Sequence, residues 1–160
     1  MIHLSSWEDL QREIDRSRRY EHSFSIVRLT SRAARRRASD RQHGERPAEL
    51  EQRALTLGVL LRKLDRVWAD GEDIYLLLPE GGHAMAESML DRIDEPLAAV
   101  MPDWEAAIAT FPDDGMSKGA LLAALGSARV RHAASSTVER KEVPAGRTAT
   151  PEKPAPHAAG

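Results

Sequence analysis

The chain has 160 residues, of which 41% are hydrophobic, and a formal net charge of −2. A chain of this length supports one domain with a sizeable core, and it holds no run of about 18 apolar residues that could span a membrane. It contains no cysteine, which excludes disulfides, thiolate metal sites and cysteine nucleophiles. The first residues lack the charged and then apolar layout of a signal peptide, so we expect a soluble, cytoplasmic protein.

The N-terminal part of the chain predicts one helix followed by one strand. Ser5 or Ser6 can cap a helix whose apolar residues recur at helical spacing to about residue 20. Residues 24–30 are mostly apolar and include β-branched side chains, which favours a strand.

An arginine-rich stretch follows, in which only Asp40 and Glu45 are acidic, so that it carries an excess of five positive charges. Its arginines are Arg28, Arg32, Arg35, Arg36, Arg37, Arg41 and Arg46. The cluster could meet phosphates or an anionic membrane face, or it could be a solvated loop. Nucleic acid is the least favoured partner, because only 4% of the residues are aromatic and no groove-reading element is recognisable.

The middle of the chain predicts a long helix and then a hairpin. Leucines recur on one helical face over residues 48–64. Two apolar runs, 67–69 and 74–78, flank an acidic turn in which Gly71 supplies the unusual φ angle.

The remaining elements complete an α+β domain. We expect a helix over about 83–100, a strand over 104–111 and a last helix from Ser117 to about residue 132. Within this order lies a βαββαβ core of the ferredoxin-like or palm type, an antiparallel sheet with helices on one face. We therefore predict one domain over 1–132. A disordered Ala/Pro-rich tail is predicted over 133–160, because that segment has no apolar period.

The hairpin carries the most informative motif. Its turn reads Asp70-Gly71-Glu72-Asp73-Ile74, and the following strand closes with Leu-Leu-Leu-Pro. This resembles the signature hairpin of the GGDEF family, the diguanylate cyclases, where the turn reads Gly-Gly-Asp-Glu-Phe. One glycine is missing and the two acids are swapped.

Three further stretches resemble the same family in the same order. Residues 104–115, with Ile-Ala-Thr-Phe-Pro as the close part, are similar to the family's Ser-x-Gly-x-Ala-x-x-Pro-x-x-Gly segment. The start of the family's closing helix is matched by 121–124. Arg62-Lys63-Leu64-Asp65 reproduces the Arg-x-x-Asp inhibitory site of many cyclases. Together the matches extend over residues 6–128 and imply a GGDEF-like fold.

The resemblance also shows what the chain lacks for the cyclase reaction. Such enzymes hold two divalent cations with carboxylates, as polymerase palms do. Thr30 falls where the family has its first metal-binding aspartate, and Arg32 falls on the next one. The segment 33–38 retains none of the family's phosphate and guanine contacts. We therefore expect no catalytic residue, no bound metal, no cofactor and no cyclase activity.

Two groups of residues remain candidates for a site. Arg62 and Asp65 could bind cyclic di-GMP through its guanine edge and phosphate, or they could form a local surface ion pair. The signature turn could retain a weak metal or nucleotide site, or it could be a solvent-exposed hairpin tip; its residues are Asp70, Gly71, Glu72 and Asp73.

These observations predict an inactive GGDEF-like regulatory or interaction module in cyclic di-GMP signalling. In this hypothesis the apolar face of the first helix and the arginine-rich loop contact a protein partner or a second copy of the chain. One alternative is a cyclic di-GMP receptor that uses Arg62 and Asp65. A second alternative is binding of nucleic acid or an anionic membrane by the arginine-rich loop.

Overall fold

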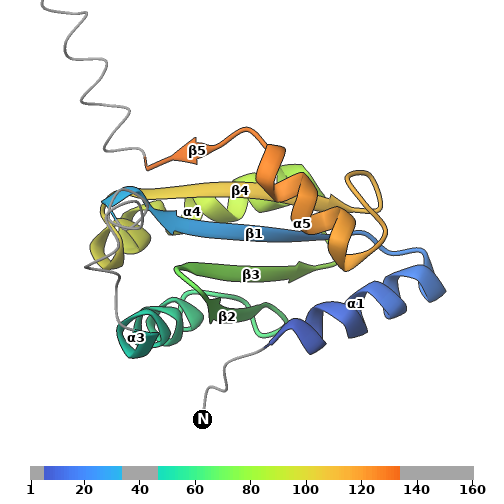
Figure 1. Cartoon of the computed structure of the whole chain (residues 1–160), viewed down its shortest axis with the longest axis horizontal. Coiled ribbons are helices and arrows are strands. Elements are labelled where there is room, and N and C mark those ends of the chain that lie inside the picture. The colour runs from blue at the N-terminus through green and yellow to red at the C-terminus, as the bar shows by residue number, and fades with distance from the viewer. Residues whose placement is uncertain (1–5, 34–46, 134–160) are drawn as a thin grey trace, which may run out of the picture.

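A computed structural model describes residues 6–33 and 47–133 as one five-stranded sheet with helices packed on it (Figure 1). The sheet order is β2-β3-β1-β4-β5, and every neighbouring pair is antiparallel. The strands are β1 (Phe24–Ser31), β2 (Arg66–Asp70), β3 (Asp73–Pro79), β4 (Trp104–Phe111) and β5 (Arg131–His132). The helices are α1 (Trp7–Tyr20), α3 (Pro47–Gly58), α4 (His83–Val100) and α5 (Lys118–Ser127).

The predicted βαββαβ core is confirmed. It runs β1, α3, β2, β3, α4 and β4, with β1 paired along its length to β3 on one side and to β4 on the other. This order and pairing are those of an antiparallel palm-like α+β domain. Among the described residues, no helix is long and apolar enough to cross a membrane.

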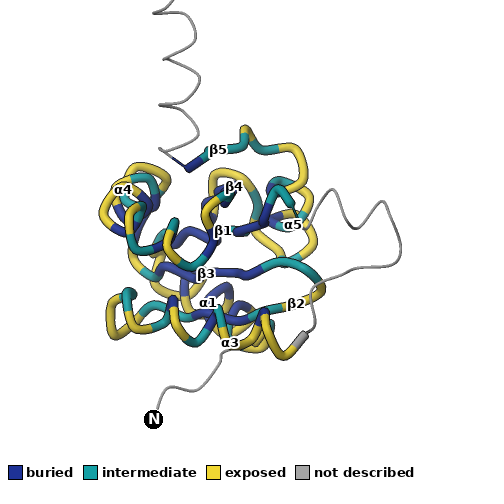
Figure 2. Tube along the Cα trace, turned by 90° about the vertical axis from the view of Figure 1, so that its left-hand side faces the viewer, coloured by how far each residue is buried: buried dark blue, intermediate teal, exposed yellow. Residues whose placement is uncertain are grey.

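The helices of the core, α3 and α4, lie on one face of the sheet as expected, but the domain as a whole has helices on both faces. Strand β1 directs Val27 and Leu29 to the face under α3 and α4, and Phe24 and Ile26 to the face under α1 and α5. The βαββαβ unit supplies only α3 and α4. The additional helices α1 and α5 cover the opposite face, which leaves the central strands β3, β1 and β4 largely buried between two layers (Figure 2).

Helix α1 begins as the sequence predicts. The Ser6 hydroxyl accepts a hydrogen bond from the Glu8 amide, and the Ser6 amide donates to the Asp9 carboxylate, so Ser6 is the cap. Leu10 and Ile14 are fully buried against the sheet. The prediction that this apolar face binds a partner is therefore wrong, because the protein's own sheet already covers it.

The second predicted helix is shorter than expected and ends at Gly58 rather than at residue 64. Glycine is a poor helix former, and the chain continues in tight turns in which the Leu60 amide donates to the Leu57 carbonyl. Leu60 and Leu61 still pack against the core. The helical spacing of the leucines thus continues past the end of α3 because the turn that follows it is also packed on the core. Leu64 is the exception and is largely exposed.

The last predicted helix also ends early, at Ser127 rather than near residue 132. Ala128 has an extended backbone, and the chain then returns to the sheet as β5. Ala133, placed in the tail by the sequence, is buried, and its amide donates to the Trp104 carbonyl. The rest of the predicted tail and most of the arginine-rich stretch lie outside the described residues.

Candidate ligand site at the polar end of the sheet

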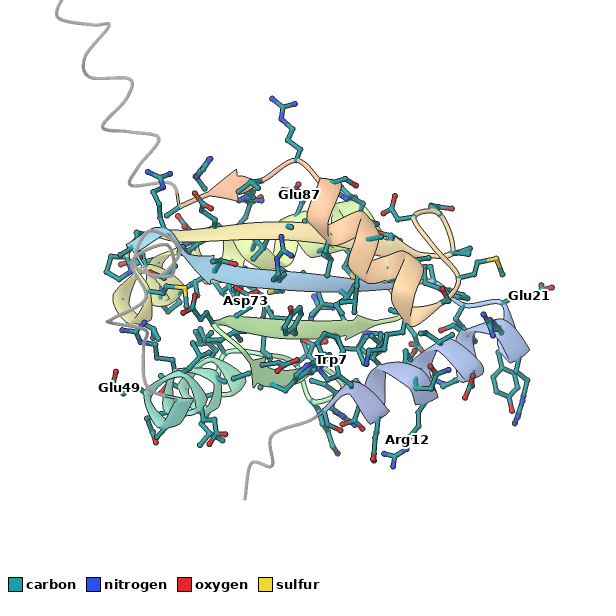
Figure 3. All side chains as sticks on the ribbon, viewed as in Figure 1. Trp7, Arg12, Glu21, Glu49, Asp73 and Glu87 are labelled. Carbon is teal, nitrogen blue, oxygen red and sulfur yellow. The ribbon has the colours of Figure 1, made fainter. Side chains whose placement is uncertain are left out.

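Polar side chains gather at the end of the sheet where β1 finishes. The strand register places Asp73, Thr30, Glu105 and His132 in one row across β3, β1, β4 and β5. Neighbours in such a row lie on the same face of the sheet, here the face that α1 and α5 cover further along. Figure 3 shows Asp73 at the start of β3, at this end of the sheet. We call these four residues the polar row.

Thr30 and Asp73 form one half of the polar row. The Thr30 hydroxyl donates to Asp73 Oδ1 over 2.8 Å, and Thr30 is only 7% exposed. The hydroxyl occupies one lone pair of the only carboxylate in β3 and contributes no negative charge of its own. The second carboxylate of the row, Glu105, is paired with Arg32, so a divalent cation here would find no free pair of carboxylates, which the cyclase reaction needs.

The other half of the row is an arginine, glutamate and histidine cluster. Arg32 Nε donates to Glu105 Oε1 over 3.1 Å, and Arg32 Nη2 lies 2.7 Å from His132 Nδ1. Because a guanidinium only donates, His132 Nδ1 accepts in this hydrogen bond. His132 Nδ1 also lies 3.5 Å from Glu105 Oε1. Glu105 is 8% exposed, and Arg32 neutralises its charge.

The cavity at the polar row is far too small for a nucleotide. It measures 10 Å³ and is lined by Arg28, Thr30, Glu105 and Val130 together with neighbouring alanines. Small-molecule pockets usually measure about 300–1,000 Å³, whereas a single water needs roughly 10–15 Å³. The Arg28 guanidinium donates across the face to the Leu125 carbonyl of α5. Within 6–33 and 47–133, no group of three His, Asp or Glu residues could hold a metal ion. The residues present do not fit a two-magnesium site.

The signature turn is anchored to α1. Gly71 has a φ of 62°, as predicted, and Asp70 pairs with Asp73 across the turn. Asp70 Oδ2 accepts a hydrogen bond from Trp7 Nε1 over 2.7 Å. The Trp7 ring contacts Trp68 and Tyr75 edge-on, with centroids 5.1 Å and 4.6 Å apart. Nothing in the sequence pattern pointed to this bond, because 63 residues separate its partners.

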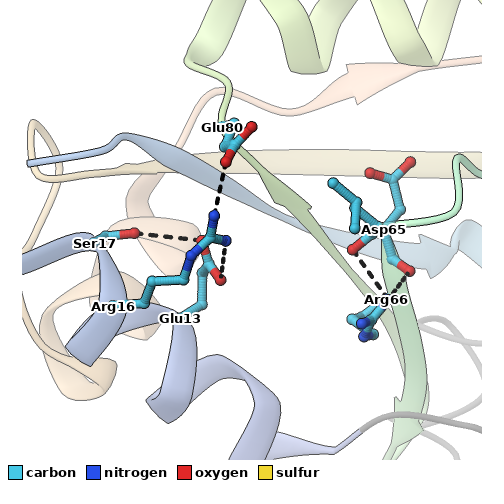
Figure 4. A network of polar contacts seen from close by, with 7 residues as sticks. Glu13, Arg16, Ser17, Asp65, Arg66 and Glu80 are labelled. Atoms are coloured by element: carbon cyan, nitrogen blue, oxygen red, sulfur yellow. Dashed lines mark hydrogen bonds and ion pairs between the residues drawn. The ribbon is translucent and has the colours of Figure 1, made fainter. Parts of the chain in front are cut away.

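The predicted pair Arg62 and Asp65 forms a turn rather than a side-chain ion pair. Asp65 Oδ2 accepts from the Arg62 amide over 2.8 Å, and the Asp65 amide donates to the Arg62 carbonyl over 3.0 Å. Figure 4 shows the neighbouring Arg66, whose Nη1 donates to the main-chain oxygens of residues 63, 64 and 65. The turn is therefore fixed from both sides, and the Arg62 side chain is exposed.

Arg92 is a residue that the sequence analysis missed. Burial raises the pKa of the Asp65 carboxyl, and the positive charges of Arg62, Arg92 and Arg66 oppose that shift. Arg92 lies on α4, and the fold brings it close enough to act on a carboxylate in the turn before β2. No local spacing connects the two segments, so only the tertiary structure reveals this arginine cluster around Asp65.

Comparison with solved structures places this arrangement in a known fold. The GGDEF domain of YfiN from Pseudomonas aeruginosa is 20% identical with a TM-score of 0.56, over 76% of this chain and 79% of that one. A sensory box/GGDEF family protein from Caulobacter crescentus is 22% identical with a TM-score of 0.57, over 76% and 87%. Diguanylate cyclase SiaD from Pseudomonas aeruginosa, solved with its activator SiaC, is 19% identical with a TM-score of 0.52, over 94% and 56%.

The chain thus has the fold of GGDEF domains, as the resemblance in its sequence implied. No family model matches the sequence, and no curated protein matches it either.

Proposed function

We propose that this chain is a GGDEF-type domain that does not carry out the cyclase reaction and acts as a regulatory or interaction module in cyclic di-GMP signalling. The likeness to GGDEF domains supports the signalling context. The hydrogen bond from Thr30 to Asp73 carries the proposal of inactivity, because it puts a neutral hydroxyl where the reaction needs a metal-binding carboxylate. The guanidinium of Arg32 is paired with Glu105 at the same end of the sheet, so this carboxylate is already engaged.

Turnover of GTP tests this proposal. Purified protein with GTP and Mg²⁺ or Mn²⁺ should give no cyclic di-GMP above a protein-free blank, while an active diguanylate cyclase serves as the positive control. Formation of product at a rate well above the blank would show that the proposal is wrong.

Metal binding by two matched variants tests the physical reason. Thr30→Asp places a second carboxylate beside Asp73 and should create measurable Mn²⁺ binding in calorimetry, whereas wild type and Thr30→Val should show none. Equal Mn²⁺ binding by wild type and Thr30→Asp would contradict the role assigned to residue 30.

The interaction role is supported by side chains that the fold leaves uncovered. The similar protein SiaD was solved in complex with its activator SiaC, which is in keeping with an interaction role. Among residues 6–33 and 47–133, four large apolar side chains are more than half exposed: Tyr20, Val59, Leu64 and Met116. Light scattering during gel filtration measures self-association. A monomer that also captures no partner in pull-downs would count against an interaction role.

A receptor for cyclic di-GMP is the second candidate, favoured by the arginines around Asp65. The exposed Arg62 and the nearby Arg92 and Arg66 could pair with phosphates, and the Asp65 carboxylate could accept from guanine N–H groups.

Calorimetry with cyclic di-GMP should show binding by wild type and by Lys63→Ala, an exposed control in the same turn. Arg62→Ala should bind at least tenfold more weakly. No heat with wild type would reject the receptor and leave the interaction module.

A further inference from the structure

The outer edge of β4 is only partly paired. Strand β5 pairs with Glu105 and Ala106 alone, and beyond it the Ala133 amide donates to the Trp104 carbonyl. At the other end of β4, the Thr110 amide donates to the Asp114 carboxylate over 2.8 Å, and the Thr110 carbonyl accepts from the Asp114 amide. Both ends of this edge are therefore closed by hydrogen bonds.

Ile108 lies between the two closed ends. Alternate residues of a strand present their main-chain groups to the same side, so Trp104, Ala106, Ile108 and Thr110 all face the outer edge. Within 6–33 and 47–133, the outward N–H and C=O of Ile108 have no hydrogen-bond partner. A main-chain donor and acceptor without partners favour pairing with another extended segment.

A cavity of 370 Å³ lies beside this open position. Ala106 and Ile108 line it on the strand side, and residues 128–131 line it on the other. The cavity exists because the chain leaves α5 in an extended conformation at Ala128 and rejoins the sheet only at Arg131. Arg131 pairs with Ala106 of β4. If this pairing continued two residues further, Arg129 would lie opposite Ile108. The volume falls in the usual range of ligand pockets.

Two arginines, Arg129 and Arg131, line the cavity with one carboxylate, Glu87, so its lining carries a positive excess; Asp91, which also pairs with Arg131, is not part of the lining. Arg131 is bound to Glu87 and to Asp91 of α4, and His83 Nε2 lies 3.2 Å from Glu87 Oε1. Arg129, which also lines the cavity, is exposed and has no ion pair in the part of the chain that the structure describes. A ligand with a negative charge is therefore favoured over a cationic one.

We propose that this cavity binds a short, extended, acidic peptide segment that adds a strand to the edge of β4. The segment pairs its main chain with the N–H and C=O of Ile108, packs apolar side chains on Ala106 and Val130, and sets a carboxylate beside Arg129. Strand addition supplies affinity through main-chain hydrogen bonds and specificity through alternate side chains. The site goes beyond the proposed function and depends on neither GTP nor cyclic di-GMP.

Amide hydrogen exchange of the free protein tests the premise. The Ile108 amide should exchange at least tenfold faster than the Ala106 amide, which pairs with β5. Equal protection of the two amides would show that the edge is closed and would overturn the proposal.

Peptide binding followed by NMR tests the site itself. The probe is acetyl-Val-Glu-Val-Glu-amide, which should slow exchange of the Ile108 amide and shift its resonance. The same peptide with methylated central amides should bind about tenfold more weakly, because it cannot donate to the strand. Acetyl-Val-Lys-Val-Lys-amide should bind more weakly as well, since its charge opposes Arg129.

Two charge-reversal variants test whether Arg129 itself attracts the acidic peptide or whether the overall charge of the protein does. Arg129→Glu should weaken binding of the Glu peptide about tenfold, and Arg19→Glu, at an exposed position on α1, should leave it unchanged. Binding that is insensitive to amide methylation, or equally weakened by both variants, would overturn the proposal.

Discussion

Two opposing effects act on the pKa of the Asp65 carboxyl. It is partly buried, and this desolvation raises the pKa of its carboxyl even though Arg62, Arg66 and Arg92 favour the charged form. A raised pKa means that the folded state prefers the protonated acid. The contribution of Asp65 to stability is therefore fully present below the ordinary value of 3.8 and is lost as pH rises through the raised pKa.

Asp65→Asn should remove this pH dependence. The amide oxygen of asparagine can still accept from the Arg62 amide, so the turn is kept. We expect the free energy of unfolding of the variant, relative to wild type, to increase as pH rises from about 3 through the raised pKa. Denaturant titrations over this range measure it, with Asp113→Asn on the exposed β4–α5 connection as the control. A difference that does not change with pH would contradict the assignment.

Single residues could be interpreted from the sequence only where a motif fixed their position. Thr30 was placed at the metal position because the strand ending there was recognisable, and the structure adds its bond to Asp73. Glu105 and His132 were not identified as partners of Arg32, because the cross-strand register that unites them is a tertiary property.

At the scale of elements, the hairpin and the last helix differ in how they use glycine. Gly71 has a positive φ, and a Cβ added there would meet no heavy atom within 4 Å, so Gly71→Ala should cost about 1 kcal/mol through backbone strain alone. Gly126, inside α5, also has open space around it, and Gly126→Ala should stabilise by about 0.5 kcal/mol. Chemical denaturation measures both variants. Changes of the same sign would contradict this explanation.

Hydrophobic periodicity predicted which segments are helices and which are strands, but it placed the ends of α3 and α5 too far along the chain. The leucines after Gly58 continued the helical spacing although the chain there forms turns, because a buried turn needs apolar side chains as much as a helix does. The return of the chain as β5 was missed for a related reason. A two-residue strand is too short to show any period, and only its pairing with Glu105 and Ala106 defines it.

At the scale of the whole molecule, one sheet separates two hydrophobic cores. Ile14 belongs to the core under α1 and α5, and Ile93 belongs to the core under α3 and α4. Ile14→Val and Ile93→Val should each destabilise by about 1 kcal/mol, and the double variant should show their sum within about 0.5 kcal/mol. Equilibrium unfolding of the three proteins checks this. A clear departure from additivity would show that the sheet transmits packing changes between its faces.

The hydrogen bond from Trp7 to Asp70 connects the first turn of α1 directly to the tip of the β2–β3 hairpin. Helix and tip cannot separate without breaking this bond and the edge-on contacts of Trp7 with Trp68 and Tyr75. A rotation of the N-terminal end of α1 would therefore move the Asp70–Asp73 turn directly, without passing through the sheet. Indole emission would register the displacement as it happens.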